Sequence, residues 1–233
     1  MSDNNLHIQP DGAKTKKLIK GAIWDMDGVL VDSGPFHLKA WQLTLRKYGM
    51  DITAAQFNTL FGMDNRRMMT ILLGHSPQEE FLAKISTEKE ALYRSLLHGK
   101  AEPFPGVMSW LENFRSKHVR QVLASSAPPA NVEALVKELE LTGFMEHSLS
   151  ALEEGLPGKP SPAIFLRAAE LLNLPIETCV VFEDSIAGVE AAKSGGFYCV
   201  AITSTNPREK LTRADWIIDR FSDLPADLFQ YEN

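Results

Sequence analysis

The chain of 233 residues has few cysteines, no long apolar run and no excess of positive charge. Its two cysteines, Cys179 and Cys199, each stand inside an apolar run. This is typical of buried free thiols in a reducing compartment, not of a disulfide framework. No apolar segment approaches the length that spans a bilayer, and the N-terminus lacks the hydrophobic region of a signal peptide. These absences predict a cytoplasmic location and argue against the membrane as a partner.

The charge balance bears on the partners. A net charge of −6 argues against nucleic acid, so an anionic substrate must be attracted by local positive groups and metal. Hydrophobic residues make up 44% of the chain and charged residues 23%, as in an ordinary globular protein. The length suits one sizeable α/β domain or a core with an inserted cap.

The most informative stretch is Ile23–Ser33, in which an apolar strand ends in Asp25 and Asp27, followed at once by Gly28. At a strand end this spacing can turn both acids toward one small volume, and the glycine permits a sharp bend. Two clustered carboxylates repel each other unless a cation or a shared proton lies between them, which suggests Mg²⁺. One acid could attack an electrophile while the other handles protons. The alternative is a plain Asp-Gly turn with both acids facing water.

Two later segments could hold a phosphate. Ser125 and Ser126 end an apolar run ahead of a helical stretch, where hydroxyl and backbone N–H groups can bind phosphate oxygens. Lys159 lies in the stiff segment Gly158–Pro162 and could neutralise an oxyanion or a phosphorylated carboxylate. Taken singly, the first is an ordinary polar helix start and the second a solvated loop lysine. Their order along the chain gives them weight.

A second acidic pair follows another apolar run. Glu183 and Asp184 come directly after Thr178–Phe182, and a helical stretch begins behind them. Acids at a helix start are common caps, so the pair alone proves little. Together with the earlier segments, it completes the set of strand-end groups that metal, phosphate and nucleophile require.

The pattern of strands and helices predicts a doubly wound parallel α/β sheet, a Rossmann-like core with its site at the carboxyl ends of the strands. The expected strands are Leu18–Trp24, Val119–Ala124, Thr178–Phe182, Tyr198–Ile202 and Trp216–Ile218. The expected helices of the core are Val107–Ser116, Asn131–Leu141, Pro162–Leu172 and Ser185–Ser194.

Residues 35–100 break this alternation, because they contain helical signals and no convincing strand. A helix is expected over Phe36–Tyr48, capping boxes at Thr53–Gln56 and Ser76–Glu79, and buried methionines at 68 and 69. The second box should open a long helix whose inner face carries Phe81, Ile85, Leu92 and Leu96. We interpret the block as an all-helical cap domain that closes over the site and selects the substrate. Residues 1–17 are then a flexible tail, and 18–34 with 101–233 form the Rossmann-like core.

The sequence resembles the haloacid dehalogenase superfamily, and within it the β-phosphoglucomutase-like phosphatases. The resemblance rests on Asp25–Val29, Ser125, Lys159-Pro160 and Glu183–Gly188, and it runs from about Leu18 nearly to the C-terminus. Pro35, His37, Ala40 and Trp41 are similar to the same branch.

This resemblance implies the roles of individual residues. Asp25 would be the nucleophile that forms an aspartyl-phosphate, and Asp27 the general acid and base. Ser125 and Lys159 would hold the transferring phosphoryl group, with Ser126 beside them. Mg²⁺ would be bound by Asp25, the Asp27 backbone carbonyl, Asp184 and, as a ligand or as an orienting group, Glu183. In the cap, His37 is the candidate for orienting Asp27; the alternative is a surface histidine in the first turn of a helix.

The resemblance leaves a choice between hydrolase and mutase. A β-phosphoglucomutase clamps a second phosphate with a cap arginine, a cap lysine and a Ser-Lys pair. Here Asn65 stands in place of the arginine, with Arg66 next to it, and Ala127-Pro128 replaces the Ser-Lys pair, whereas Lys89 matches the lysine. We therefore expect a monomeric, Mg²⁺-dependent hydrolase of a small phosphorylated metabolite, a sugar or polyol phosphate, with a phosphosugar mutase as the alternative. A phosphate-binding protein without turnover is disfavoured, because no catalytic group is missing.

Overall fold

The computed structural model describes residues 7–8 and 16–232. It divides into two compact units, of which one contains the chain up to Asp32 and again from Glu102 onward, and the other is Ser33–Ala101. In the described part of the chain, no helix is both long and apolar enough to cross a membrane.

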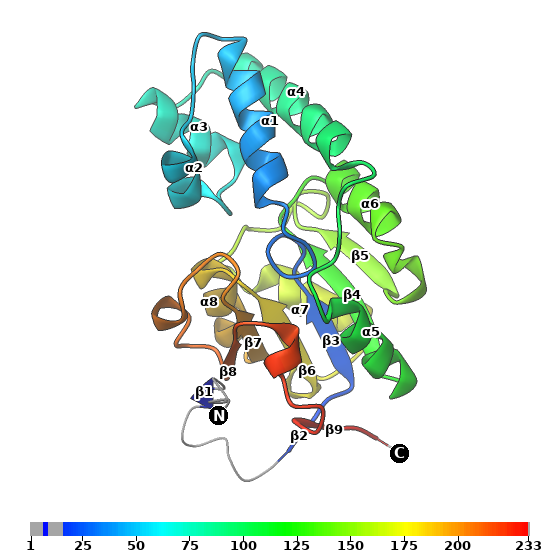
Figure 1. Cartoon of the computed structure of the whole chain (residues 1–233). Helices are drawn as coiled ribbons and strands as arrows, with labels where there is room; N and C mark the ends of the chain where they lie inside the picture. Colours follow the sequence, from blue (N-terminus) through cyan, green and yellow to red (C-terminus); the bar gives the residue numbers. More distant parts are fainter. Residues whose placement is uncertain (1–6, 9–15, 233) are drawn as a thin grey trace, which may run out of the picture. The chain divides into compact units, whose positions relative to one another are not determined.

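The larger unit is built on a seven-stranded sheet with the order β1-β8-β7-β6-β3-β4-β5 (Figure 1). All neighbouring strands run parallel except β1, which is antiparallel to β8. The strands are β1 (His7–Ile8), β3 (Gly21–Trp24), β4 (Arg120–Ser125), β5 (His147–Ser150), β6 (Cys179–Glu183), β7 (Tyr198–Ile202) and β8 (Trp216–Ile218). A separate parallel pair joins β2 (Lys17–Leu18) to β9 (Phe229–Gln230).

Helices cover both faces of this sheet. On one face, α7 (Ala163–Leu171) and α8 (Ile186–Ser194) bury small and aliphatic side chains against the central strands. On the other face, Trp24 stacks on Phe182 with ring centroids 4.0 Å apart, and Phe114 of α5 (Val107–Ser116) packs beside them. The remaining helices of this unit are α6 (Pro129–Glu138) and the short 3-10 turns η1 (Leu141–Gly143), η2 (Ile176–Thr178), η3 (Arg208–Lys210) and η4 (Phe221–Asp223). This arrangement confirms the predicted doubly wound α/β fold.

The order of the strands reverses between β3 and β6. The chain passes from β3 to β4 in one direction and from β6 to β7 in the other, while β3 and β6 are themselves paired, with Trp24 opposite Phe182. In doubly wound sheets, the loops that leave the carboxyl ends at such a reversal diverge and open a crevice for a ligand. Asp25 and Asp184 begin these two loops.

Several elements were missed or misplaced by the sequence prediction. β5 was missed because its four residues, His-Ser-Leu-Ser, do not form an apolar run. It nevertheless pairs with β4, with Ser148 opposite Leu123. The strand expected over Leu18–Trp24 is two strands, because residues 17–18 pair with β9 before β3 begins. The predicted flexible tail lies mostly outside the described residues, but His7–Ile8 within it pair with β8.

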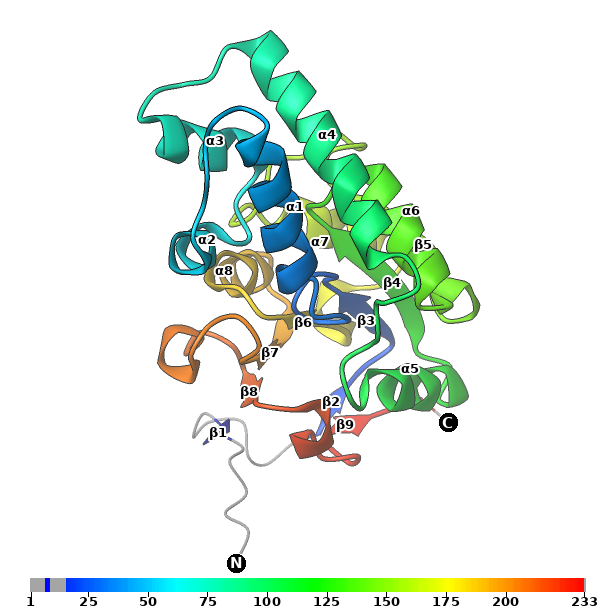
Figure 2. The ribbon, with the colours of Figure 1, turned by 45° about the horizontal axis from the view of Figure 1, so that its top comes forward.

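The smaller unit is wholly helical, as predicted. It contains α1 (Gly34–Arg46), α2 (Ala54–Leu60), α3 (Asn65–Leu73) and α4 (Glu79–Leu97), and α1 lies alongside α4 in both views (Figure 1 and Figure 2). The capping box at Thr53 is present, with Gln56 as its partner. The expected core methionines, Met68 and Met69, are buried.

Two details of the α4 prediction were wrong. The helix begins two residues later than the Ser76 capping box implies, since its N-cap is Gln78, which makes no side-chain capping bond. Its buried face contains Leu82, Ile85, Lys89, Tyr93 and Leu97, whereas the expected Phe81, Leu92 and Leu96 are half-buried. The sequence pattern did not reveal this buried face of α4, because a charged residue, Lys89, lies at its centre.

Candidate active site

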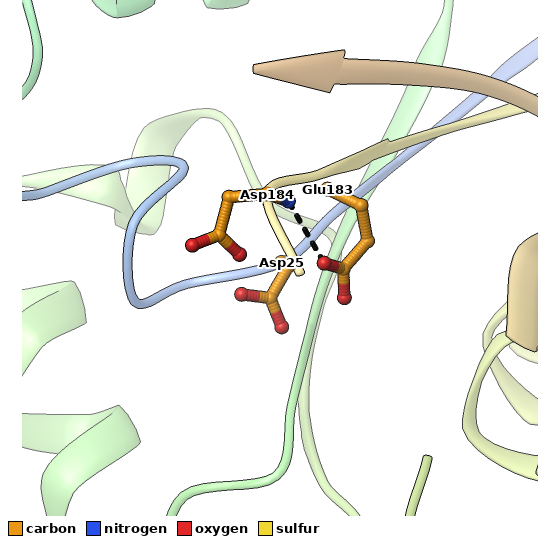
Figure 3. Close-up of side chains that lie close together, drawn as sticks. All are labelled: Asp25, Glu183 and Asp184. Atoms are coloured by element: carbon orange, nitrogen blue, oxygen red, sulfur yellow. Dashed lines mark hydrogen bonds between the residues drawn. The ribbon is translucent and has the colours of Figure 1, made fainter. Parts of the chain in front are cut away.

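Three acidic side chains meet where the strand order reverses. Asp25 follows β3, Glu183 ends β6, and Asp184 follows Glu183; one ligand oxygen from each lies within 4.8 Å of the others (Figure 3). They are buried, with 7%, 0% and 4% of their surfaces exposed, respectively. Carboxylates so close together and so poorly hydrated repel one another strongly. A positive charge is needed to hold them there.

Lys159 supplies part of that charge. Its Nζ donates to Asp25 Oδ1 at 2.5 Å and to Glu183 Oε1 at 2.5 Å, so one ammonium joins the two strand ends. Burial lowers the pKa of Lys159, but the charges of Asp25 and Glu183 outweigh it and hold this pKa above its usual range. Burial has the opposite effect on the acid: it raises the pKa of Asp25 to about 7, even though Lys159 lowers it.

Glu183 is the most fully hydrogen-bonded of the three acids. Its Oε2 accepts the backbone N–H groups of Asp184 and Ser185 at 2.8 and 2.9 Å and the Ser185 hydroxyl at 3.0 Å. Burial tends to raise the pKa of Glu183, but Lys159 and these donors hold it below its usual value. A Cβ on Gly188 would lie 1.8 Å from Glu183 Oε1, so the carboxyl group packs against α8 at a position where only glycine leaves room for it. Glu183 therefore orients Lys159 and the loop after β6.

Asp184 is held from the opposite side. Its Oδ2 accepts the Thr205 hydroxyl at 2.5 Å, and a Cβ on Gly28 would lie 2.0 Å from this oxygen. Gly28 also has φ +84°, a conformation that few side chains tolerate. Burial raises the pKa of Asp184 well above its usual value, and the negative charges of Glu183 and Asp25 add to this.

The donor set fits a small divalent cation. Three buried carboxyl groups face a single ammonium, so the ionised cluster has an uncompensated negative charge. Carboxylate oxygens are the ligands that hard ions such as Mg²⁺ prefer. A cation between Asp25 and Asp184 would favour the ionised form of both groups and so oppose the effect of burial, the main reason that their pKa values are raised.

Of the other predicted core residues, Asp27 and Ser125 also follow or end central strands. The side chain of Asp27 is not one of the three grouped carboxyl groups, and its predicted contribution to a metal site is its backbone carbonyl. Ser125, at the end of β4, is buried, and its Oγ accepts the N–H of Ala127 at 3.0 Å. Because a hydroxyl donates and accepts at once, Ser125 can still give its hydrogen to a phosphate oxygen. Ser126 is exposed next to it.

The predicted residues of the helical unit are all engaged with neighbours in that unit. Lys89, which is 3% exposed, lies 2.8 Å from His37 Nδ1 and donates to Glu90 at 2.9 Å. The His37 ring stacks on Tyr93 with centroids 3.9 Å apart. Arg66 forms a two-pronged ion pair with Glu79, at 2.7 and 2.6 Å.

Sequence reasoning missed the polar residues that hold these loops. Ser150 of β5 donates to the carbonyl of Ala127 at 2.7 Å and so fixes the loop after Ser125. Ser204, Thr205 and Asn206 follow β7 after one intervening residue and donate to the loops of Gly28 and Asp184. A signal was available, because a run of hydroxyl and amide residues follows a predicted parallel strand at the same sheet edge.

Known proteins resemble this chain over most of its length. The family model for haloacid dehalogenase-like hydrolase matches residues 19–196. A "Phosphorylated carbohydrates phosphatase" of Thermotoga maritima is 33% identical over 76% of this chain and 82% of its own. The "Fructose-1-phosphate phosphatase YqaB" of Escherichia coli is 30% identical over 78% and 95%, respectively.

Among solved structures, a β-phosphoglucomutase from Clostridium difficile superposes with a TM-score of 0.79 at 26% identity, over 89% of this chain and 94% of its own. The predicted resemblance to the β-phosphoglucomutase-like branch and the predicted enzyme class, a phosphatase, are confirmed by these matches. The chain belongs to the haloacid dehalogenase-like hydrolase family.

Proposed function

We propose that this protein is a Mg²⁺-dependent phosphatase that hydrolyses a small sugar or polyol phosphate through an aspartyl-phosphate on Asp25. One observation carries the proposal: Lys159 joins Asp25 to Glu183 beside Asp184, in a buried cluster where the strand order reverses. This cluster offers a nucleophile, a fixed ammonium and a cation site within one small volume.

Asp25 is the proposed nucleophile. Its carboxylate oxygen attacks phosphorus, a bond forms between them, and the ester P–O bond to the alcohol breaks. An anionic phosphate repels an anionic carboxylate, so the attack requires positive charge at the site. Lys159 contributes it by binding Asp25 Oδ1 at 2.5 Å, with an ammonium that stays protonated throughout.

Asp27 is the proposed proton carrier. In the first step, its carboxyl group gives a proton to the leaving alkoxide; in the second, its carboxylate takes one from the water that attacks the acyl phosphate. The second step releases inorganic phosphate and regenerates Asp25. Asp27 suits both steps because it lies two residues beyond the nucleophile, in the turn that Gly28 closes by donating to the Val31 carbonyl at 2.9 Å.

The remaining groups bind the phosphoryl oxygens and the cation. Ser125, with Ser126 next to it, donates to the transferring group. Asp25, Asp184 and the Asp27 carbonyl would hold Mg²⁺, with Glu183 orienting Lys159 instead of binding metal, because both its oxygens are already engaged. When bound, Mg²⁺ would supply the charge that keeps Asp25 and Asp184 ionised and that neutralises the phosphoryl oxygens.

The substrate class is proposed from the relatives. Two of them are named for the hydrolysis of phosphorylated carbohydrates and of fructose 1-phosphate, and each matches more than three quarters of this chain. A small phosphorylated polyol or sugar is therefore the substrate to test first.

A hydrolase is favoured over a phosphosugar mutase by the cations of the helical unit. A mutase would need Arg66 or Lys89 to clamp a second phosphate, but the first is paired with Glu79 and the second contacts Glu90. Asn65, in the arginine position, donates to Glu90 at 2.9 Å. Hydrogen bonds to a charged group contribute about 1.5–3 kcal/mol each, so a missing clamp is a substantial loss. A binding protein without turnover is disfavoured, because Asp25, Asp27 and Lys159 are all present.

The test is phosphate release from a panel of phosphorylated sugars, polyols, nucleotides and pyrophosphate, with and without Mg²⁺. We expect Mg²⁺-dependent release that is fastest with a sugar or polyol phosphate. Asp25→Asn should retain less than about a hundredth of the activity, a barrier rise of ~2.7 kcal/mol or more. Asp51→Asn, an exposed acid of the helical unit, is the matched control and should stay active. Release without added metal, after chelation, would contradict the proposal. Monomeric state and cytoplasmic location stay predictions.

A further inference from the structure

The segment that follows β7 connects two loops of the proposed active site. Ser204 donates its hydroxyl to the Gly28 carbonyl, in the loop after β3. Thr205 donates to Asp184 Oδ2 at 2.5 Å, in the loop after β6. Asn206 donates from Nδ2 to the Asp184 carbonyl at 3.2 Å and to Thr205 Oγ1 at 3.1 Å. Three consecutive polar side chains thus bind the loops that carry the nucleophile and the second metal ligand.

The contacts of Thr205 fix the rotation of the Asp184 carboxyl group. Asp184 Oδ2 lies between the Thr205 hydroxyl and Gly28. A Cβ added to Gly28 would be 2.0 Å from this oxygen and 2.9 Å from Thr205 Cγ2. Rotating the carboxyl group would break the hydrogen bond on one side or collide with Gly28 on the other. The second oxygen of Asp184 is thereby left for a cation shared with Asp25.

We propose that Thr205 is a positioning residue, which holds one oxygen of Asp184 so that the other binds the metal ion. This rests on the proposed function, because it presumes a cation between Asp25 and Asp184. Thr205 is exposed, whereas Asp184 is 4% exposed, so the bond joins a surface hydroxyl to a buried ligand. The hydroxyl also restricts the free carboxyl group before a metal arrives, and such pre-orientation contributes to affinity.

The test is isothermal titration calorimetry, in which full-length protein freed of metal by a chelator is titrated with MgCl₂. The Mg²⁺ affinity is compared among the wild type and three variants. Thr205→Val removes the hydroxyl at nearly constant shape and should weaken Mg²⁺ binding by about 10–100-fold, the usual effect of losing a group that orients a ligand. Thr205→Ser keeps the donor and should restore most of the affinity. Thr203→Val is the matched control, because Thr203 Oγ1 donates at 2.8 Å to Asp219 instead and should leave Mg²⁺ affinity unchanged.

The outcomes distinguish a failure of the proposed function from a failure of the role proposed for Thr205. Wild type that binds no Mg²⁺ contradicts the proposed function itself. Wild type and Thr205→Val that bind Mg²⁺ equally well overturn the role of Thr205 alone. A second readout is kinetic: at saturating Mg²⁺ the KM for the phosphate ester should stay near wild type, whereas the Mg²⁺ concentration for half-maximal rate rises. A raised KM at saturating Mg²⁺ with unchanged metal affinity would assign Thr205 to the substrate and overturn the proposal.

Discussion

Replacing Glu183 by glutamine tests whether this buried acid stabilises the site through Lys159. Glutamine can keep accepting the two backbone N–H groups of the loop after β6, but its NH₂ group then meets the Lys159 ammonium at the position of the 2.5 Å contact. Both side chains are almost fully buried, at 0% for Glu183 and 9% for Lys159. Breaking a buried ion pair from one side costs about 3–5 kcal/mol. Because Lys159 keeps Asp25 as a partner, we expect a loss of ~3 kcal/mol.

The assay is urea unfolding at pH 7 with chelator, followed by tryptophan fluorescence, since Trp24 stacks on Phe182, next to Glu183. Glu154→Gln is the matched control, because its ion pair with Arg167 is about one third exposed and such pairs contribute ~0–1 kcal/mol. The midpoint should fall for Glu183→Gln at an unchanged slope with denaturant. A loss no larger than that of the control would refute the role given to Glu183.

The remaining predictions concern a glycine, pH and the product. Gly28→Ala should lower both stability and activity more than Gly49→Ala, because both have positive φ but a Cβ meets Asp184 only at residue 28; equal losses in thermal melts would contradict this. Without metal, the free energy of unfolding should fall as the pH rises from the usual Asp value of 3.8 to about 7, because the raised pKa values of Asp25 and Asp184 let the folded state keep protons that the unfolded state loses. The lowered pKa of Glu183 makes the free energy of unfolding rise with pH instead, but this rise is complete once the pH exceeds the usual Glu value of 4.5. Saturating Mg²⁺ should reduce the dependence of the free energy of unfolding on pH. With β-glucose 1-phosphate, phosphorus NMR should show inorganic phosphate; efficient formation of glucose 6-phosphate would favour a mutase.

The core strands could be predicted because they are apolar. Tyr198–Ile202 and Trp216–Ile218 lie where the sequence placed them, since both are buried runs in a parallel sheet. β5 could not be found in this way, because its serines are needed at the sheet edge, where Ser150 holds the Ala127 carbonyl. The polar residues that made this strand unpredictable include Ser150, which fixes the loop after Ser125.

The grouping of Asp25, Lys159, Glu183 and Asp184 followed from motif order, because parallel strands bring their carboxyl ends to one edge. What the sequence could not reveal is which group each residue contacts. Whether Glu183 is a metal ligand depends on four hydrogen bonds that involve its own loop and Lys159. Likewise, the pairing of Arg66 with Glu79 depends on how α3 packs on α4.

The most direct test of the account is to trap the phosphoryl group on the protein. Wild type, Asp25→Asn and Asp27→Asn are mixed with acetyl phosphate and Mg²⁺, quenched with acid and analysed by intact mass and peptide mapping. We predict one phosphoryl group on Asp25 in the wild type, slower decay of the same species in Asp27→Asn, and none in Asp25→Asn. A phosphoryl group on any other residue, or steady turnover by Asp25→Asn, would contradict the central claim.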